Sequence, residues 1–239
     1  MENKTDSDYV FKAYVVNTAA YDAGEREDSG AWLYFPPRAG EVQSLFEKIG
    51  LPPDAAPGKY FMDDYVSHVE GMENVLPMYG DIQELSEVAQ AVSGLSPEDR
   101  DLLAAVQESQ HRLTSLSQFK EFPGNSEYFI LEGNIHSKTD LGWRYITDHM
   151  DTALPKELRD AIDPVPFGRY AMEDEQGCFT SRGYLSLSGD EWQHEHAAER
   201  TQRAAEKKPS IRERLEQGKK ECANRQTPPQ ARGRSGPEL

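Results

Sequence analysis

The 239-residue sequence has few of the features that mark secreted or membrane-spanning proteins. Its two cysteines, Cys178 and Cys222, lie far apart, so we expect no disulfide framework, and a reducing compartment fits. The first residues contain no apolar run of the kind that a signal peptide needs. The chain also has no run of about 18 apolar residues, the length that a membrane-spanning helix requires. We therefore expect a cytoplasmic protein that does not span a membrane.

Common catalytic motifs are also missing. The sequence contains no HExxH, no GxSxG and no glycine-rich phosphate loop. Cys178 falls in a predicted strand without a nearby histidine, so packing explains it better than nucleophilic catalysis. His194 and His196 would point the same way in a strand, as metal ligands can, but the polar start of a tail explains them more simply. We predict no catalytic residue, no metal site and no cofactor.

Positive charge is scarce over much of the chain. Residues 1–195 contain 36 Asp and Glu against 15 Lys and Arg, a net charge of −21, whereas residues 196–239 carry a net charge of +5. Between Tyr60 and Gln110, eleven carboxylates accompany a single cation, Arg100. A large field of one sign repels DNA and anionic membranes, and it attracts basic surfaces, including those that normally bind nucleic acid. Solubility alone is the plainer explanation of an acidic composition.

Hydrophobic patterning predicts an α+β protein made of three small consecutive units and a tail. The first unit, residues 1–65, has predicted strands at 9–18, 31–35 and 59–65 and a helix at 41–49. The second, residues 66–124, is predicted to be an acidic helical bundle with a weak helix candidate at 66–72. The third, residues 125–192, has a predicted strand at 127–131, helices at 139–150 and 155–162, and a hairpin formed by 169–172 and 179–187. A basic, mostly disordered tail is predicted for residues 193–239.

The middle unit carries the clearest helix signals. Asp81 is a good N-cap with Glu84 as its capping-box partner. Apolar side chains follow at spacings of three and four, at Ile82, Leu85, Ala89 and Val92. A second start signal is the run Ser96-Pro97-Glu98-Asp99. We expect the buried face of this second helix to contain Leu102, Val106 and Leu113.

Helix electrostatics explain only part of the acidity. The helix dipole favours acids near helix N-termini, which accounts for Asp81, Glu98 and Asp99. Like charges three or four residues apart repel each other, and lysines would ordinarily separate them. The carboxylates left unexplained are Glu87, Asp101 and Glu108.

The spacing of these charges can be compared with that of DNA. Duplex DNA carries one charge per roughly 1.7 Å, and a helix with an acid at every third residue carries one per about 4.5 Å. Two or three elements that share a face would approach the density of a duplex. An elongated arrangement of the three units could therefore resemble nucleic acid electrostatically.

Three separated stretches of the sequence carry a family resemblance. They read YVVNTAAYDAGEREDSGAWLYFPP near the start, GDIQELSEVAQ in the middle and FGRYAMEDEQGCFTSRGYLSLS near the end. Together they resemble the ArdA-type antirestriction proteins of conjugative elements, over about residues 9–190. The tail at 196–239 goes beyond the family's usual end.

The resemblance implies a function without catalysis. Such proteins look like bent B-form DNA, work as elongated homodimers and occupy the DNA-binding groove of type I restriction–modification enzymes, on their specificity and methyltransferase subunits. They thereby protect an incoming mobile element, and the acidic body itself does not bind nucleic acid. The resemblance also implies that the C-terminal unit makes the dimer contact.

What the resemblance transfers to this sequence is an acidic, partner-binding face. We assign that face to Asp63, Asp64, Glu70, Glu73, Asp81, Glu84, Glu87, Glu98, Asp99, Asp101 and Glu108. Two alternatives remain open. A small metal-dependent carboxylate enzyme, such as a nuclease, would need acids that converge on one cleft, and a generic acidic scaffold protein of a mobile element would need no mimicry.

Overall fold

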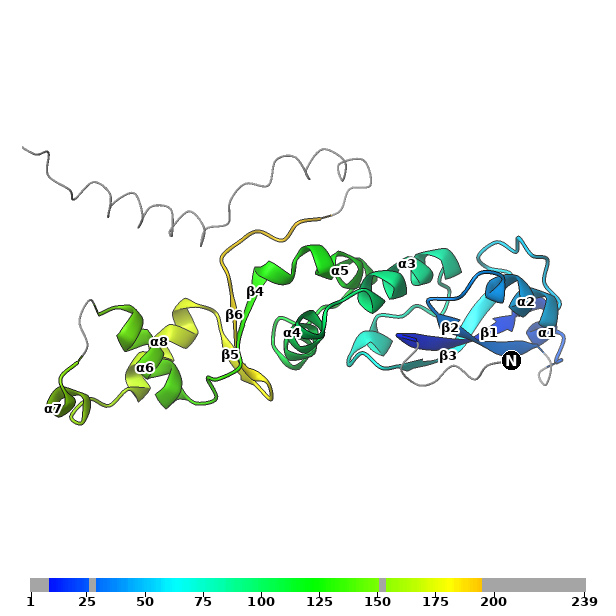
Figure 1. Ribbon diagram of the computed structural model, residues 1–239. Helices are drawn as coiled ribbons and strands as arrows, with labels where there is room; N and C mark the ends of the chain where they lie inside the picture. Colours follow the sequence, from blue (N-terminus) through cyan, green and yellow to red (C-terminus); the bar gives the residue numbers. More distant parts are fainter. Residues whose placement is uncertain (1–8, 26–28, 151–153, 195–239) are drawn as a thin grey trace, which may run out of the picture. The chain divides into compact units, whose positions relative to one another are not determined.

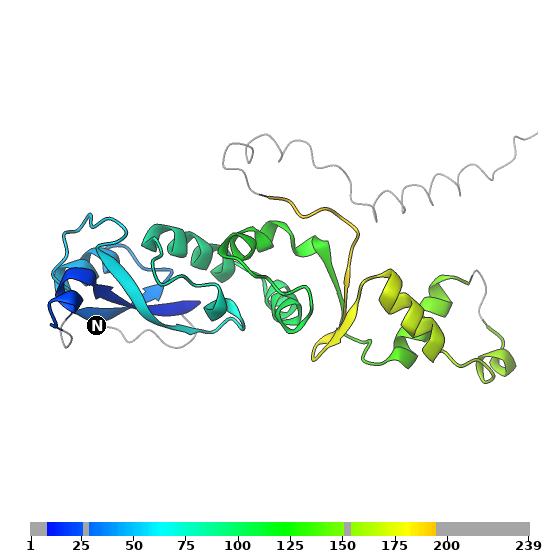
Figure 2. The same cartoon turned by 180° about the vertical axis from the view of Figure 1, so that it is seen from behind.

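The computed structural model describes residues 9–25, 29–150 and 154–194. Described residues up to Ser188, together with Trp192–His194, belong to one compact unit, and residues 189–191 belong to another. The larger of these two units contains two antiparallel sheets and several helices (Figures 1 and 2), which confirms the predicted α+β class. The division into three units, its boundaries and its elongated form stay predictions. Residues 195–239 of the predicted tail lie outside the described residues.

The first sheet has the strand order β2-β1-β3 and consists of β1 (Phe11–Asn17), β2 (Gly30–Phe35) and β3 (Tyr60–Ser67), as predicted. Both pairings of β1 are antiparallel. In β1 the side chains of Phe11, Ala13 and Val15 are buried, whereas Lys12 and Tyr14 between them are half-buried. This alternation is typical of a sheet with one face on the core.

The helices of the first half lie between the strands of this sheet and after them in the chain. They are α1 (Thr18–Asp22), α2 (Glu41–Lys48), the 3₁₀ turn η1 (Met72–Asn74), α3 (Ile82–Ser93), α4 (Pro97–Glu108) and α5 (Leu116–Glu121), followed by the 3₁₀ turns η2 (Phe122–Gly124) and η3 (Ser126–Tyr128). The starts of α3 and α4 confirm the N-caps predicted at Asp81 and Ser96, but within the described residues no hydrogen bond of Glu84 completes the predicted capping box. The Asp81 carboxylate accepts a hydrogen bond from the Gln83 N–H at 2.9 Å, and the Ser96 hydroxyl accepts one from the Asp99 N–H at 3.0 Å.

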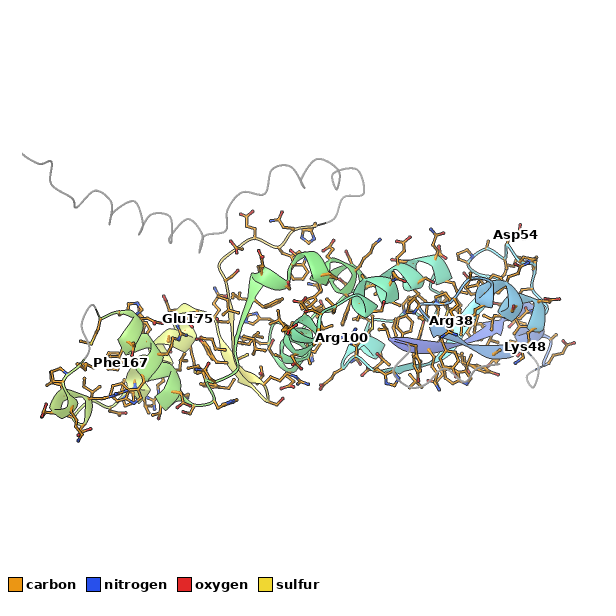
Figure 3. All side chains as sticks on the ribbon, in the orientation of Figure 1. Arg38, Lys48, Asp54, Arg100, Phe167 and Glu175 are labelled. Atoms are coloured by element: carbon orange, nitrogen blue, oxygen red, sulfur yellow. The ribbon has the colours of Figure 1, made fainter. Side chains whose placement is uncertain are left out.

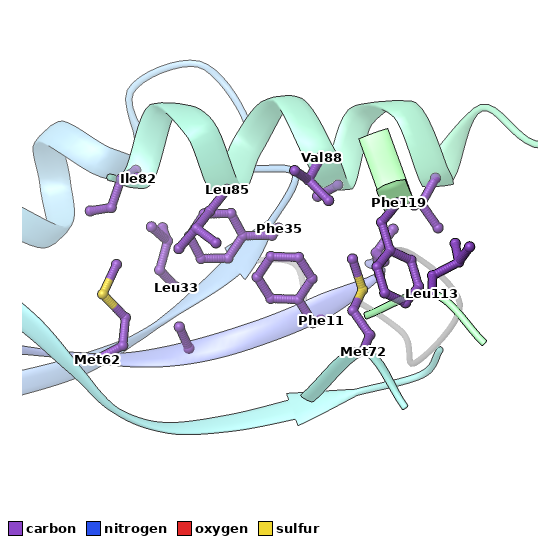
Figure 4. Packing of buried hydrophobic residues seen from close by; sticks show 14 of the residues in the cluster. Phe11, Leu33, Phe35, Met62, Met72, Ile82, Leu85, Val88, Leu113 and Phe119 are labelled. Atoms are coloured by element: carbon purple, nitrogen blue, oxygen red, sulfur yellow. The ribbon is translucent and has the colours of Figure 1, made fainter. Parts of the chain in front are cut away.

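The main core lies between α3 and the inner face of the first sheet. The predicted stripe of α3 is buried along its whole length, at Ile82, Leu85, Ala89 and Val92. Figure 4 shows Leu85 and Val88 of α3 beside Phe11 and Phe35 of the sheet. Truncating a fully buried leucine to alanine typically costs about 2–5 kcal/mol, so this packing fixes the rotation of α3 about its axis. As a consequence, Glu84 and Glu87 lie on the exposed side of the helix.

The second sheet has the order β4-β6-β5 and consists of β4 (Phe129–Glu132), β5 (Cys178–Thr180) and β6 (Gly183–Leu187). Between β4 and β5 the chain forms α6 (Lys138–Asp148), α7 (Lys156–Arg159) and α8 (Val165–Asp174). Helices α6 and α8 approach closely at two glycines. A Cβ atom on Gly142 would overlap the carbonyl oxygen of Pro164, and one on Gly168 would overlap that of Lys138, so both positions require glycine.

Several local predictions were wrong. Residues 169–172 are part of α8 and not of a strand, and the hairpin turns at Ser181 and Arg182 instead of at 173–177. The predicted helix at 66–72 is the end of β3 followed by η1, and the helix predicted at 155–162 is only the four-residue α7. Leu113 is buried, but it lies beyond the end of α4, and α5 was not predicted. Runs this short do not distinguish helix from strand by periodicity.

Candidate partner-binding surface

The eleven predicted acids lie on a few consecutive elements. Two are on β3, two in or near η1, three at the start and on the outer side of α3, and four on α4. All of them lie at the surface, although Asp99 is half-buried and the side chain of Glu108 is only 21% exposed. Figure 3 shows the side chains of these elements, with Arg100 labelled on α4. Three overlapping groups can be described by what each carboxylate contacts.

The first group caps helices. Asp81 is the N-cap of α3, and Asp99 lies in the first turn of α4, where its carboxylate accepts a hydrogen bond from the Ser96 hydroxyl at 2.9 Å. Glu98 lies in the same first turn. These positions agree with the predicted stabilisation of acids by the helix dipole. The charges are nevertheless exposed or half-exposed, so a structural role does not remove them from the surface.

The second group is paired with cations from distant parts of the sequence. The Glu87 carboxylate lies 2.6 Å from the ammonium group of Lys120 on α5. This hydrogen bond, together with one from the Gln83 amide, lowers the pKa of Glu87. Lys120 is 33 positions further along the chain. The Glu87 charge is therefore partly neutralised within the protein.

Glu108 and Asp101 are paired with the turn between β5 and β6. The Glu108 carboxylate accepts hydrogen bonds from the Ser181 N–H and hydroxyl, both at 2.7 Å, and from the Arg182 guanidinium. The Ser181 donors are the main cause of a lowered pKa of Glu108, whose side chain is only 21% exposed. The Arg182 Nε lies 3.7 Å from the Asp101 carboxylate. Glu108 thus tethers α4 to the second sheet.

These contacts explain the three carboxylates that helix electrostatics left without a reason. Glu87, Asp101 and Glu108 each have a cation partner. The close pairs of Glu87 and Glu108 have a structural role in addition to any role in binding, whereas the Asp101 contact is longer and its side chain is 74% exposed, so it stabilises the fold little. Sequence reasoning could not find the partners because they lie on other elements. Arg100, the single Lys or Arg between Tyr60 and Gln110, donates instead to the carbonyl of Ser93 at the end of α3.

The third group, which includes the first, has no cation partner in the described residues. Across the described ranges 9–25, 29–150 and 154–194, ion pairs with Lys, Arg or His are missing for Asp63, Asp64, Glu70, Glu73, Asp81, Glu84, Glu98 and Asp99. These eight residues, which we call the unpaired acids, lie on β3, near η1, and on α3 and α4. Their charges add without local compensation, which produces a field attractive to a basic surface.

Further acids, which the sequence reading did not assign, gather around one arginine in the C-terminal part. Arg144 on α6 forms a bidentate pair with Glu175 at 2.8 and 2.7 Å and lies 3.2 Å from Glu132 and 3.6 Å from Asp148. The side chain of Arg144 is 23% exposed, and its pKa is raised, chiefly by the hydrogen bonds to Glu175. Of these contacts, only the one with Asp148 could have been predicted from the sequence, because Asp148 lies four residues further along the same helix.

The buried carboxylate of Glu121 contacts the last described residues of the chain. Glu121 accepts a hydrogen bond from the Trp192 indole at 2.8 Å, and its carboxylate lies 3.2 Å from the imidazole of His194. His196, the other histidine considered as a metal ligand, lies outside the described residues. Within the described part of the chain, no three His, Cys, Asp or Glu side chains are grouped so that they could bind a metal ion. Cys178 is partly buried in β5.

Fold and surface together define an acidic α+β protein with fixed, exposed carboxylates on consecutive elements. No helix in the described residues is long and apolar enough to cross a membrane. A comparison with curated protein sequences finds no match. The family model of the antirestriction protein ArdA, in contrast, matches residues 13–186. The chain therefore belongs to the ArdA antirestriction protein family, which confirms the resemblance seen in the three sequence stretches.

Proposed function

We propose that this protein protects an incoming mobile element by mimicking DNA. In this proposal the unpaired acids occupy the DNA-binding groove of a type I restriction–modification enzyme, on its specificity and methyltransferase subunits. The protein competes with DNA for that groove and catalyses no reaction, so it needs neither cofactor nor metal ion. It acts in the cytoplasm, where incoming DNA meets the restriction enzyme, and the acidic body does not bind nucleic acid itself.

One observation carries the proposal, namely the eight carboxylates without cation partners. A single helix with an acid at every third residue presents one charge per about 4.5 Å, which is sparse beside the 1.7 Å of duplex DNA. Here β3, η1, α3 and α4 each contribute unpaired acids. A groove that pairs its lysines and arginines with phosphates can pair them with these carboxylates, because both ligands present anionic oxygens.

The test is a plating experiment followed by a binding measurement. Unmodified phage is plated on cells that contain a type I restriction system, with and without this protein, and we expect the protein to raise the plating efficiency. With purified components, the full-length protein should displace duplex DNA from the enzyme, and its affinity should fall steeply as salt rises. An unchanged plating efficiency together with no displacement of DNA would contradict the proposal.

We further propose that α7 and α8 form the contact of a homodimer. Large apolar side chains are exposed there, including Leu158 of α7 and Phe167 and Tyr170 of α8, of which Tyr170 is 55% exposed. Figure 3 labels Phe167. The ring of Tyr145 on α6 contacts Tyr170 at 5.4 Å between centroids and Phe167 at 6.5 Å, so these three rings are contiguous. Patches of this kind commonly mark protein interfaces.

Sedimentation measures the proposed dimer directly. The full-length protein should sediment as a dimer, and Tyr170→Glu should convert it to a monomer, because a buried unpaired carboxylate is costly at an interface. Tyr79→Glu is the matched control, since Tyr79 is equally aromatic and more exposed but lies far along the chain. A wild-type monomer, or dissociation by both variants alike, would contradict this interface.

A further inference from the structure

The outer face of the first sheet is aromatic, where a polar face is the norm. An antiparallel sheet with one face on the core usually presents polar side chains on the other. The outward positions of β1 and β2 are instead Lys12 and Tyr14 on β1, opposite Tyr34 and Trp32 on β2. The rings of Tyr14 and Trp32 are 5.4 Å apart. Aromatic side chains on a solvent-facing sheet call for an explanation in terms of binding.

One end of this face already binds a cation. The ammonium group of Lys12 lies 4.8 Å from the ring centroid of Trp32 and 5.8 Å from that of Tyr34. Such distances are typical of cation–π attraction, in which the negative face of the ring stabilises a positive charge. The protein's own structure thus demonstrates the chemistry that these rings favour.

The other end carries a second row of rings. Phe61 of β3 contacts Tyr21 of α1 at 5.3 Å and Tyr79 at 6.2 Å. Tyr79 is the most exposed large apolar side chain in the described residues, at 72%, and its neighbour Met78 is 52% exposed. The Met62 N–H donates a 2.8 Å hydrogen bond to the Met78 carbonyl, which holds this segment beside β3. The ring of Tyr79 is therefore presented by a fixed backbone.

No cation of the described residues lies over the ring of Tyr79. Exposed carboxylates instead lie close to these rings in the sequence. Asp81 follows Tyr79 by two positions, and Asp63 follows Phe61 by two positions, where β3 bulges between its pairings with Tyr14 and Val15. An exposed ring with nearby carboxylates suits a guanidinium group, which stacks on aromatic faces and pairs with carboxylates.

We propose that Tyr79 is a docking point for an arginine side chain of the protein partner. The inference rests on the proposed function, because it takes the basic DNA-binding groove of the restriction–modification enzyme as the partner. It adds a contact that DNA mimicry by charge alone does not require. Tyr79 would bind the partner through its ring, and the unpaired acids would bind it through their charge.

The test compares binding of four full-length variants to the enzyme by calorimetry over a range of salt concentrations. Tyr79→Ala should weaken binding about tenfold. Tyr79→Phe keeps the ring and should bind within about twofold of the wild type. Met78→Ala is the matched control, since it removes a neighbouring exposed apolar side chain without a ring, and it should also bind within about twofold. Glu84→Gln supplies the charge comparison.

The dependence of affinity on salt distinguishes the charge contact of Glu84 from the ring contact of Tyr79. Glu84→Gln should flatten the dependence of affinity on salt, because one charge pair is lost, whereas Tyr79→Ala should leave the slope unchanged. Circular dichroism checks the fold of each variant, and the high exposure of Tyr79 makes a loss of folding unexpected.

The outcomes distinguish this inference from the proposed function. If Glu84→Gln weakens binding and Tyr79→Ala does not, the docking point is wrong and the mimicry stands. Equal losses for Tyr79→Ala and Met78→Ala would show plain apolar contact and overturn the role of the ring. If Tyr79→Ala changes self-association instead, the face binds a second copy and the inference is wrong. If the wild type fails to bind the enzyme, both proposals fail.

Discussion

The acids of α3 and α4 and those around Arg144 differ in what surrounds them. Arg144 gathers Glu132, Asp148 and Glu175 within 3.6 Å, and a half-buried cation thereby offsets part of their charge. Glu84 and Glu98, in contrast, have no cation partner within the described ranges. The residue types are the same in both regions. Their availability to a partner is decided by where the few cations lie.

The comparison changes which of the predicted acids are available to bind a partner. Eight of its eleven acids resemble Glu84, and the other three, Glu87, Asp101 and Glu108, resemble the Arg144 cluster because a cation already holds them. A variant that reverses the charge of Glu87 or Glu108 would lose an internal ion pair together with a surface charge. Such a variant cannot separate binding from structure, so the decisive changes belong among the unpaired acids.

The largest effect should follow from removing three unpaired charges. In the combined variant Glu73→Gln, Glu84→Gln and Glu98→Gln, each lost charge pair should cost about 1 kcal/mol of binding. Together they should weaken displacement of DNA from the enzyme on the order of 100-fold at low salt. The stability in urea should change little, since none of the three has an ion pair to lose within the described residues.

A matched control removes the same number of charges elsewhere. The control variant combines Glu25→Gln, Glu47→Gln and Asp54→Asn. These three exposed acids lie within residues 1–65 but outside the assigned face. This control should displace DNA within about threefold of the wild type. Equal losses in the two triple variants would mean that net charge matters and the position of the acids does not.

The Arg144 cluster should show the opposite behaviour, a loss of stability with little loss of binding. Arg144→Ala leaves the carboxylates of Glu132 and Glu175 half-buried without their cation, which should lower the free energy of unfolding by about 2 kcal/mol. Urea denaturation measures this loss. Lys156→Ala is the control, because the Lys156–Asp160 pair is largely exposed and should contribute almost nothing. Similar free energies of unfolding for Arg144→Ala and Lys156→Ala would contradict a structural role for the Arg144 cluster.

Local signals in the sequence were sufficient for much of this structure. The caps at Asp81 and Ser96 and the stripe from Ile82 to Val92 depend on residues within one or two turns, so pattern reasoning located α3 and α4 and the outward direction of Glu84. The strands of the first sheet were found in the same way. These features follow from period and capping chemistry alone.

Features made by distant residues could not be predicted. Lys120 lies 33 positions from Glu87, and Arg182 lies 74 positions from Glu108, so no local pattern links them. The segment 169–172 was predicted as a strand, yet the close approach at Gly168 places it in a helix packed on α6. Prolines around the start of α8 were the one local signal that could have corrected this error.

Glu108 should make the contact of α4 with the hairpin sensitive to acid. Its pKa is lowered in the folded protein, so its stabilising contribution is full above the usual glutamate pKa of about 4.3 and is lost as the pH falls through the lowered value. Glu108→Gln should cost about 1 kcal/mol at neutral pH, because the carboxylate's charged hydrogen bonds to Ser181 and Arg182 are weakened. Urea unfolding at pH 7 and pH 3 should show this difference shrinking in acid. A difference that is constant with pH would mean that the Glu108 charge contributes nothing.

The smallest expected effect is also the sharpest test, because it turns a paired acid into an unpaired one. Lys120→Gln frees the Glu87 carboxylate, whose lowered pKa should rise toward its ordinary value in an NMR titration. With one cation fewer beside α3, displacement of DNA from the enzyme should improve about twofold. Lys48→Gln on α2 removes the same charge away from Glu87 and controls for net charge alone. Improvement by Lys120→Gln alone would show that pairing decides which acids a partner can use, whereas equal improvement by both variants would show that only the total charge matters.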